Sequence, residues 1–254
     1  MFELGIQKNW IDALYARSSV RQYTGAPDKE QLDRLGETCR KLSWQGVKIR
    51  MFKGPGLKSQ IKGTDVYAVI VAKRGTPMEV EGYMGEALVL EATSMGLGTC
   101  WLGAGFYPDI INRNVDLQTD EAVHCVISIG KANLPAFAPK RKELVKVCGM
   151  DEAQLGQLGA WQKEAVLAAR LAPSAINQQP WKIVADKTSV SSLETTVLYK
   201  KDAPLDRGIC MLHAAVGAAK AGRTGLWKKV DGGYAMKAET VYQKRKNENL
   251  ALFP

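Results

Sequence analysis

The chain has 254 residues, of which 46% are hydrophobic and 24% charged, the composition of an ordinary globular protein. At this length it needs no metal or disulfide framework, and it can form one large domain or two small ones. The net charge of +9 is spread along the sequence without aromatic–basic interleaving, so no nucleic-acid partner is expected. No segment approaches the roughly 18 apolar residues of a membrane span, and no secretory signal is visible. We expect a cytoplasmic protein that does not bind membranes.

The cysteines and histidines argue against a metal site. The five cysteines are scattered and never spaced as C-x-x-C, which is typical of reduced thiols in the cytoplasm. The two histidines, His124 and His213, have no ligand pair nearby. We interpret both as core histidines with satisfied hydrogen bonds.

Hydrophobic periodicity predicts helices and strands along the whole chain. Helices are expected at 6–16, 28–42, 79–96, 161–171 and 206–221, and strands at 66–72, 99–102, 122–129, 181–185, 195–199, 224–230 and 234–241. The helices at 79–96 and 206–221 are apolar nearly all round, which indicates burial inside a core. A turn at Gly232-Gly233 joins the last two strands.

A weak internal repeat relates the two halves of the chain. Shifting the sequence by 126 positions (208 − 82) superposes four pairs: Gly82 on Gly208, Ala92 on Ala218, Gly96 on Gly222, and Trp101 on Trp227. Each copy would be a buried helix that ends at glycine and leads into a strand. Four such matches favour a duplication about as much as they favour chance.

The glycines at 96 and 98 do not form a dinucleotide-binding loop. Such a loop follows a strand and opens a helix, so that a phosphate meets the helix N-terminus. Here the glycines close a helix and precede a strand. We interpret both as helix C-terminal caps.

Two segments carry side chains suited to a ligand. Arg17-Ser18-Ser19-Val20-Arg21 sets two guanidiniums around two hydroxyls, which can hold a phosphate, although a solvated helix end would look the same. A charged residue beside a helix end carries little packing, so removing Arg17 should leave the fold intact. The second segment, 172–181, places prolines, small residues and amides between a helix and a strand, suited to a planar heterocycle, although a plain turn remains the alternative.

Together these segments resemble the nitroreductase-like flavoprotein family. The family pattern R-R-S-x-R-x-[FY] is similar to 16–23, A-P-S-x-x-N-x-Q-P-W to 172–181, and G-L-G-x-x-W-[IL]-G to 96–103. The resemblance covers about 10–231. It implies an α+β fold, a mixed sheet with buried central helices, and bound FMN. It assigns the phosphate and ribityl chain to Arg17, Ser18, Ser19 and Arg21, with Lys140 and Arg141, and the N5 edge to the backbone of Glu81 and Gly82. It places Pro173, Ser174, Ala175 and Asn177 along the isoalloxazine ring.

The order of the motifs departs from ordinary members. Their A-P-S segment follows the R-S segment by a few tens of residues, whereas here it comes 155 residues later (172 − 17). Ordinary members are dimers in which this loop comes from the partner subunit. The chain thus resembles single-chain members whose two half-domains mimic that dimer. We expect halves at 1–149 and 150–254, divided near Gly149, in a monomer with internal pseudo-twofold symmetry and one flavin.

The resemblance implies ping-pong hydride transfer, from NAD(P)H through FMN to a nitro, quinone or similar small oxidised acceptor. The flavin carries the chemistry in such enzymes, so no catalytic side chain is assigned. Two alternatives remain from the sequence. One is a flavin-binding carrier or sensor without turnover, and the other is a basic interaction module that kept the fold and lost the cofactor.

Overall fold

The computed structural model describes residues 4–43, 46–54, 57, 60–103, 106–132, 140–197 and 200–240. The chain divides into two compact units. The N-terminal unit is Asp12–Lys140, and the C-terminal unit combines Arg141–Pro254 with Met1–Ile11. The expected halves, 1–149 and 150–254 with a boundary near Gly149, stay a prediction.

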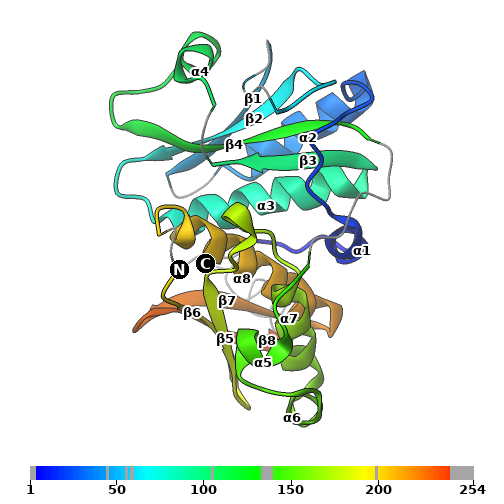
Figure 1. Ribbon diagram of the computed structural model, residues 1–254, viewed down its shortest axis with the longest axis vertical. Helices are drawn as coiled ribbons and strands as arrows, with labels where there is room; N and C mark the ends of the chain where they lie inside the picture. The colour runs from blue at the N-terminus through cyan, green and yellow to red at the C-terminus, as the bar shows by residue number, and fades with distance from the viewer. Residues whose placement is uncertain are drawn as a thin grey trace, which may run out of the picture. The chain divides into compact units, whose positions relative to one another are not determined.

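The N-terminal unit is built on a four-stranded antiparallel sheet of order β1-β2-β4-β3 (Figure 1). Its strands are β1 (Val47–Lys53), β2 (Val66–Lys73), β3 (Leu97–Leu102) and β4 (Glu121–Lys131). Its helices are α2 (Lys29–Lys41), α3 (Met78–Ser94) and α4 (Pro108–Asn114), preceded by α1 (Asn9–Ala16), which spans the division between the units. Helix α3 contacts all four strands and α2 contacts β1 and α3, so both helices cover one face of the sheet.

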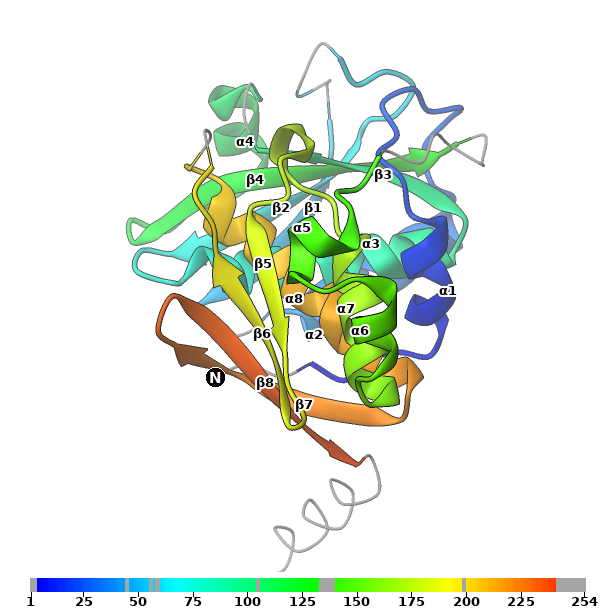
Figure 2. The same cartoon turned by 60° about the horizontal axis from the view of Figure 1, so that its bottom comes forward.

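The C-terminal unit has the equivalent sheet, of order β5-β6-β8-β7 (Figure 2). Its strands are β5 (Trp181–Ala185), β6 (Ser189–Glu194), β7 (Arg223–Val230) and β8 (Gly233–Thr240). Its helices are α5 (Leu144–Cys148), α6 (Glu152–Gly156), α7 (Ala160–Arg170), the short 3₁₀ helix η1 (Ala175–Asn177) and α8 (Ala203–Lys220). Helices α7 and α8 pack together against the sheet.

Both units therefore share one order of elements: a helix, two strands, a buried helix and two further strands. Helix α3 is buried from Glu79 to Thr93 and α8 from Leu205 to Ala218, as the two all-round apolar segments predicted. The prediction of an α+β fold with buried central helices is confirmed. Among the described residues, parallel pairing is confined to two isolated bridges, Ser19 with Thr99 and Gln22 with Lys62.

Close backbone approach explains two glycines in these layers. A Cβ on Gly217 would lie 2.3 Å from the Glu164 carbonyl oxygen, so glycine lets α8 approach α7. Gly98 lies inside β3, where a Cβ would stand 2.9 Å from side-chain atoms of Val20 and Ala132. The interpretation of Gly98 as a helix cap is therefore wrong. Gly96, with φ +75°, follows α3 in the left-handed conformation and fits the cap prediction.

The pattern at 195–199 misplaced one strand. Strand β6 runs from Ser189 to Glu194, and its pairing with β8 ends at Leu193 opposite Gly233. Residues 195–197 lie beyond the sheet, and 198–199 are outside the described residues. Strand β1 was missed because charged residues interrupt its apolar run.

Candidate functional site

The Arg17–Arg21 segment leaves α1 and joins the edge of the N-terminal sheet. The Val20 amide donates to the Thr99 carbonyl at 2.8 Å, and Ser19 bridges to Thr99 of β3. This attachment buries Arg17 and Ser18, which are only 7% and 6% exposed, and leaves Arg21 exposed. The segment is not a solvated helix end.

The buried end of this segment has unsatisfied donors. Arg17 Nε lies 3.9 Å from Glu86 Oε1, too far for a hydrogen bond, and Glu86 Oε2 accepts one from Trp101 Nε1 at 2.7 Å. Among the described residues, neither Arg17 Nε nor Ser18 Oγ has a hydrogen-bond partner. Burial lowers the pKa of Arg17, which the charge of Glu86 counteracts. A desolvated cation and a buried hydroxyl with free hydrogen-bonding capacity suit an anionic ligand.

Glu81 and Gly82 lie in the first turns of α3, and both are buried. The Glu81 side chain contacts His124 of β4, whose Nδ1 lies 2.9 and 3.1 Å from the two carboxylate oxygens. Burial raises the pKa of Glu81, and the contact with His124 opposes that rise.

The geometry of β4 explains why His124 reaches Glu81. The pairing with β2 passes from Cys125 to Val123, so His124 is the extra residue of a β-bulge. Its side chain is 39% exposed. The interpretation of His124 as a core histidine is wrong, because its side chain is partly exposed, although Glu81 does give its ring a hydrogen-bond partner. Regular strand alternation gave no signal of this contact. His213 is fully buried, with Nδ1 3.2 Å from the Ala168 carbonyl, as expected of a core histidine.

In the C-terminal unit, Arg141 and Asn177 are brought into contact. Arg141 donates to the Leu171 carbonyl, at the end of α7, from Nε at 3.2 Å and from Nη2 at 2.9 Å. Its Nη1 donates to Asn177 Oδ1 at 3.2 Å. Lys140, by contrast, is exposed at the end of the N-terminal unit. Arg141 therefore ties the loop at 172–180 to the end of α7.

The loop at 172–180 has a strained backbone. Ile176, Asn177 and Gln179 have φ of 46°, 57° and 49°, in the left-handed region that few residues other than glycine adopt. Asparagine tolerates this conformation, but a β-branched isoleucine does so at a cost. The Ile176 side chain is 80% exposed, so its own packing does not hold it there.

Polar contacts around the loop compensate for this strain. Ser174 Oγ accepts from the Gln179 amide at 2.8 Å, and Gln179 Oε1 accepts from the Lys142 amide at 2.8 Å. The Ala175 amide donates to both carboxyl oxygens of Asp206, at 3.0 and 3.1 Å. Burial, reinforced by the charge of Asp202, raises the pKa of Asp206 to about 8.

Sequence reasoning assigned no role to Asp206 or Gln179. Asp206 stood at the start of a predicted helix, where an acidic residue is ordinary. The predicted flavin-binding residues are divided between the units: Arg17, Ser18, Ser19, Arg21, Glu81, Gly82 and Lys140 lie in the N-terminal unit, and Arg141, Pro173, Ser174, Ala175 and Asn177 lie in the C-terminal unit.

Among the described residues, no group of three or more histidine, cysteine, aspartate or glutamate residues could hold a metal ion. In the same part of the chain, none of the helices is both long and apolar enough to cross a membrane.

The whole fold is similar to that of a solved structure, described as a putative nitroreductase from Thermotoga maritima MSB8. The two chains are 23% identical over 93% of this chain and 97% of the other, with a TM-score of 0.67. An FMN-dependent nitroreductase from Clostridium difficile R20291 matches 51% of this chain and 91% of its own, at 21% identity and a TM-score of 0.42. Nitroreductase A from Vibrio parahaemolyticus matches 58% of this chain and 77% of its own, at 16% identity and a TM-score of 0.43. No curated protein matches the chain.

The Thermotoga maritima structure shares the fold of this chain. A family model described as "Putative TM nitroreductase" matches residues 9–218, most of the chain. The chain belongs to this nitroreductase family, which confirms the resemblance of its motifs.

Proposed function

We propose that the protein is an FMN-dependent oxidoreductase of the nitroreductase type. In this proposal it works in the cytoplasm and uses NAD(P)H to reduce a small nitro, quinone or similar oxidised compound. Family membership supports the general class. The proposal that the cofactor is FMN rests on one observation. Two buried donors, Arg17 Nε and Ser18 Oγ, lack hydrogen-bond partners among the described residues.

These residues fit the phosphate end of FMN. Buried polar atoms in folded proteins nearly always have partners, so an unsatisfied guanidinium nitrogen beside an unsatisfied hydroxyl calls for an acceptor. A phosphate offers several acceptor oxygens to such donors. Ser19 and the exposed Arg21 would complete this end, with Lys140 and Arg141 adding positive charge.

The loop at 172–180 would bind the ring end. Asn177 lies in the strained part of this loop, and Arg141 donates a hydrogen bond to the Asn177 amide oxygen. Pro173, Ser174 and Ala175 precede Asn177 in the loop. Strain of this kind is often found at ligand-binding positions. The proposal that this loop and the Arg17 segment serve one flavin rests on the family motifs, as does the assignment of Glu81 and Gly82 to the N5 edge.

The protein's contribution is binding and electrostatics. Bound FMN would supply hydride chemistry, accepting from NAD(P)H and donating to the oxidised compound in turn. Arg17 and Ser18 would hold the anionic end. Asn177, oriented by Arg141, would meet the polar edge of the ring.

The test is the visible spectrum of the purified protein, followed by release and weighing of the bound compound. We expect a yellow protein that releases FMN and not FAD, because the chain has a phosphate-binding segment but no dinucleotide loop. Steady-state oxidation of NADH and NADPH with a nitroaromatic and a quinone then tests turnover. A colourless protein that takes up no added FMN would overturn the proposal. Bound FMN without turnover would identify a carrier or sensor instead.

A further inference from the structure

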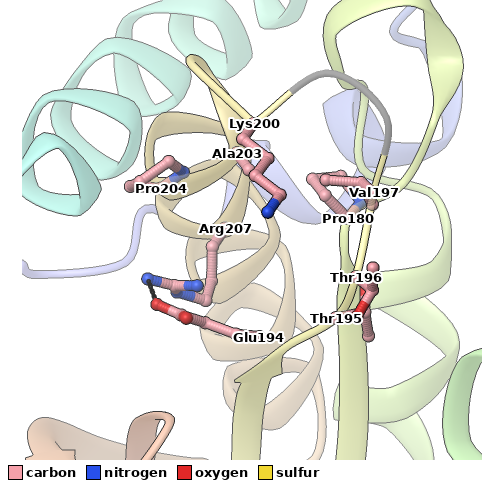
Figure 3. Close-up of a pocket in the computed structure, with 9 residues that line it drawn as sticks. All are labelled: Pro180, Glu194, Thr195, Thr196, Val197, Lys200, Ala203, Pro204 and Arg207. Atoms are coloured by element: carbon pink, nitrogen blue, oxygen red, sulfur yellow. Dashed lines mark ion pairs between the residues drawn. The ribbon is translucent and has the colours of Figure 1, made fainter.

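The C-terminal unit contains a cavity that the proposed flavin residues do not line. Its volume is about 340 Å³, and it lies where the chain leaves β6 and enters α8 (Figure 3). Three kinds of side chain surround it: cationic (Arg207, Lys200), hydroxyl-bearing (Thr195, Thr196) and apolar (Pro180, Val197, Ala203, Pro204). Glu194 is the one carboxylate among these lining residues.

Arg207 is the most buried charge of this cavity. It comes from the first turns of α8, and its side chain is only 5% exposed. Its Nη2 donates to Glu194 Oε1 at 2.9 Å, and Figure 3 draws this ion pair at one side of the cavity. A desolvated guanidinium binds carboxylate and phosphate oxygens more strongly than one in water.

Glu194 is a replaceable partner. Its side chain is 65% exposed, so it returns to water at little cost when another oxyanion takes its position on Arg207. Lys200 extends from the segment before α8 into the space between Arg207 and Pro180 (Figure 3). The lining therefore has two positive charges for one exposed negative charge, with hydroxyl groups and an apolar wall beside them.

The internal repeat relates Arg207 of this cavity to Glu81, one of the proposed flavin residues. Arg207-Gly208 lies 126 positions after Glu81-Gly82 (207 − 81 and 208 − 82), and both pairs lie in the first turns of a buried helix. The N-terminal unit has a carboxylate there, held by His124, whereas the C-terminal unit has a guanidinium. The same position of the fold thus has opposite charge in the two units.

We propose that this cavity, which we call the Arg207 pocket, binds a small organic oxyanion, a carboxylate or phosphate monoester on a compact apolar body. The anionic group binds Arg207 and Lys200 and displaces Glu194, and the body lies against Pro180, Val197 and Pro204. The inference stands on the geometry of the pocket and does not depend on the protein being an oxidoreductase.

Two residues of the pocket are also sequence neighbours of residues that form or hold the loop at 172–180. Pro180 directly follows the strained Gln179, and Arg207 directly follows Asp206, which holds the Ala175 amide. A ligand in the Arg207 pocket therefore contacts Pro180 and Arg207, the sequence neighbours of Gln179 and Asp206, which hold the loop at 172–180 in place.

Phenyl phosphate is a suitable probe, titrated into the purified full-length protein by calorimetry, with benzyl alcohol as the uncharged control. We expect saturable binding of phenyl phosphate and none of benzyl alcohol. Lys200→Gln should weaken binding about tenfold, the effect of one charge-assisted hydrogen bond. Lys201→Gln is the matched control, an exposed neighbour outside the pocket, and should leave binding unchanged.

Glu194→Gln gives the sharpest result, because it removes a competing anion and should strengthen binding about threefold to tenfold. The three substituted residues are exposed, so the fold should persist in all of them. Three results would each overturn the inference: no binding of phenyl phosphate, equal losses in the two lysine variants, or weaker binding in Glu194→Gln. None of them depends on flavin content or turnover.

Discussion

At the scale of single residues, burial determines what Arg17 does. The premise that Arg17 carries little packing is wrong, because its side chain is 2% exposed and Glu86, with which it forms a 3.9 Å ion pair, is fully buried. Removing the cation would leave a buried carboxylate with less compensating charge. The residue therefore affects both stability and ligand binding.

Arg17→Ala should weaken FMN binding by about 1.5–3 kcal/mol, the range of a charge-assisted hydrogen bond. It should also lower the stability of the apo-protein. Titration of apo-protein with FMN measures the first effect, and urea denaturation without FMN measures the second. Arg74→Ala is the control, since Arg74 is exposed and the net charge changes equally. Equal FMN affinities in the two variants would remove Arg17 from the cofactor site.

Asn177 needs a different pair of substitutions, because its φ is 57°. Asn177→Gly keeps this backbone conformation and removes the amide, whereas Asn177→Ala removes the amide and adds strain. If the amide meets the flavin ring, both variants should shift the visible flavin spectrum or its reduction potential, with a further loss of stability only in the alanine variant. An unchanged spectrum and potential in the glycine variant would limit Asn177 to a loop role.

At the scale of elements, the loop at 172–180 depends on α8 through Asp206. The pKa of this carboxyl is about 8 in the folded protein, against an ordinary value of 3.8. As the pH rises from about 4 to about 8, the unfolded chain loses this proton while the folded protein keeps it. The unfolded state therefore becomes relatively more favourable, and the free energy of unfolding falls.

Asp206→Asn should abolish this part of the pH dependence, since an amide oxygen accepts from the Ala175 amide without a charge. We expect the wild type to lose about 5 kcal/mol relative to the variant between pH 4 and pH 8, given about 1.4 kcal/mol for each pH unit by which the folded and unfolded pKa values differ. Urea denaturation at several pH values measures the difference. Parallel stability curves would show that Asp206 is ionised in the folded protein throughout this range.

At the scale of the whole molecule, one order of strands and helices occurs twice with different side chains. Arg17 and Ser18 stand in the N-terminal unit, and the strained loop follows α7 in the C-terminal unit. The chain thus has one copy of each predicted ligand segment. One copy of each segment is what we expect if the chain binds a single flavin.

We predict one FMN per chain in a protein that is monomeric in solution. Light scattering gives the mass, and absorbance after release of the flavin gives the stoichiometry. Flavin should stay bound on dilution, because no second subunit is needed. Two flavins per chain, or loss of flavin as a dimer dissociates, would contradict the single-chain arrangement and leave the assignment to the nitroreductase family unchanged.

Sequence by itself predicted helices α1, α2, α3, α7 and α8, most strands and the family, but not the short helices α4, α5 and α6. Segments such as 66–72 and 206–221 are predictable because their apolar pattern matches their burial, and the Asp28 cap of α2 follows from local hydrogen bonding. The A-P-S motif and the Arg17 segment stand in the sequence as contiguous residues. The sequence pattern was sufficient to predict those features that depend on residues close together in the chain.

Tertiary structure alone decided the electrostatics. The bulge that turns His124 onto Glu81, the pairing of Arg207 with Glu194 and the contact of Asp206 with Ala175 join residues 43, 13 and 31 positions apart (124 − 81, 207 − 194 and 206 − 175). Packing of helices on a sheet sets how deeply each charge is buried, and burial determines whether it shifts its pKa or needs a partner. Only the folded chain shows that Arg17 is buried, because the segment around it becomes buried by joining β3.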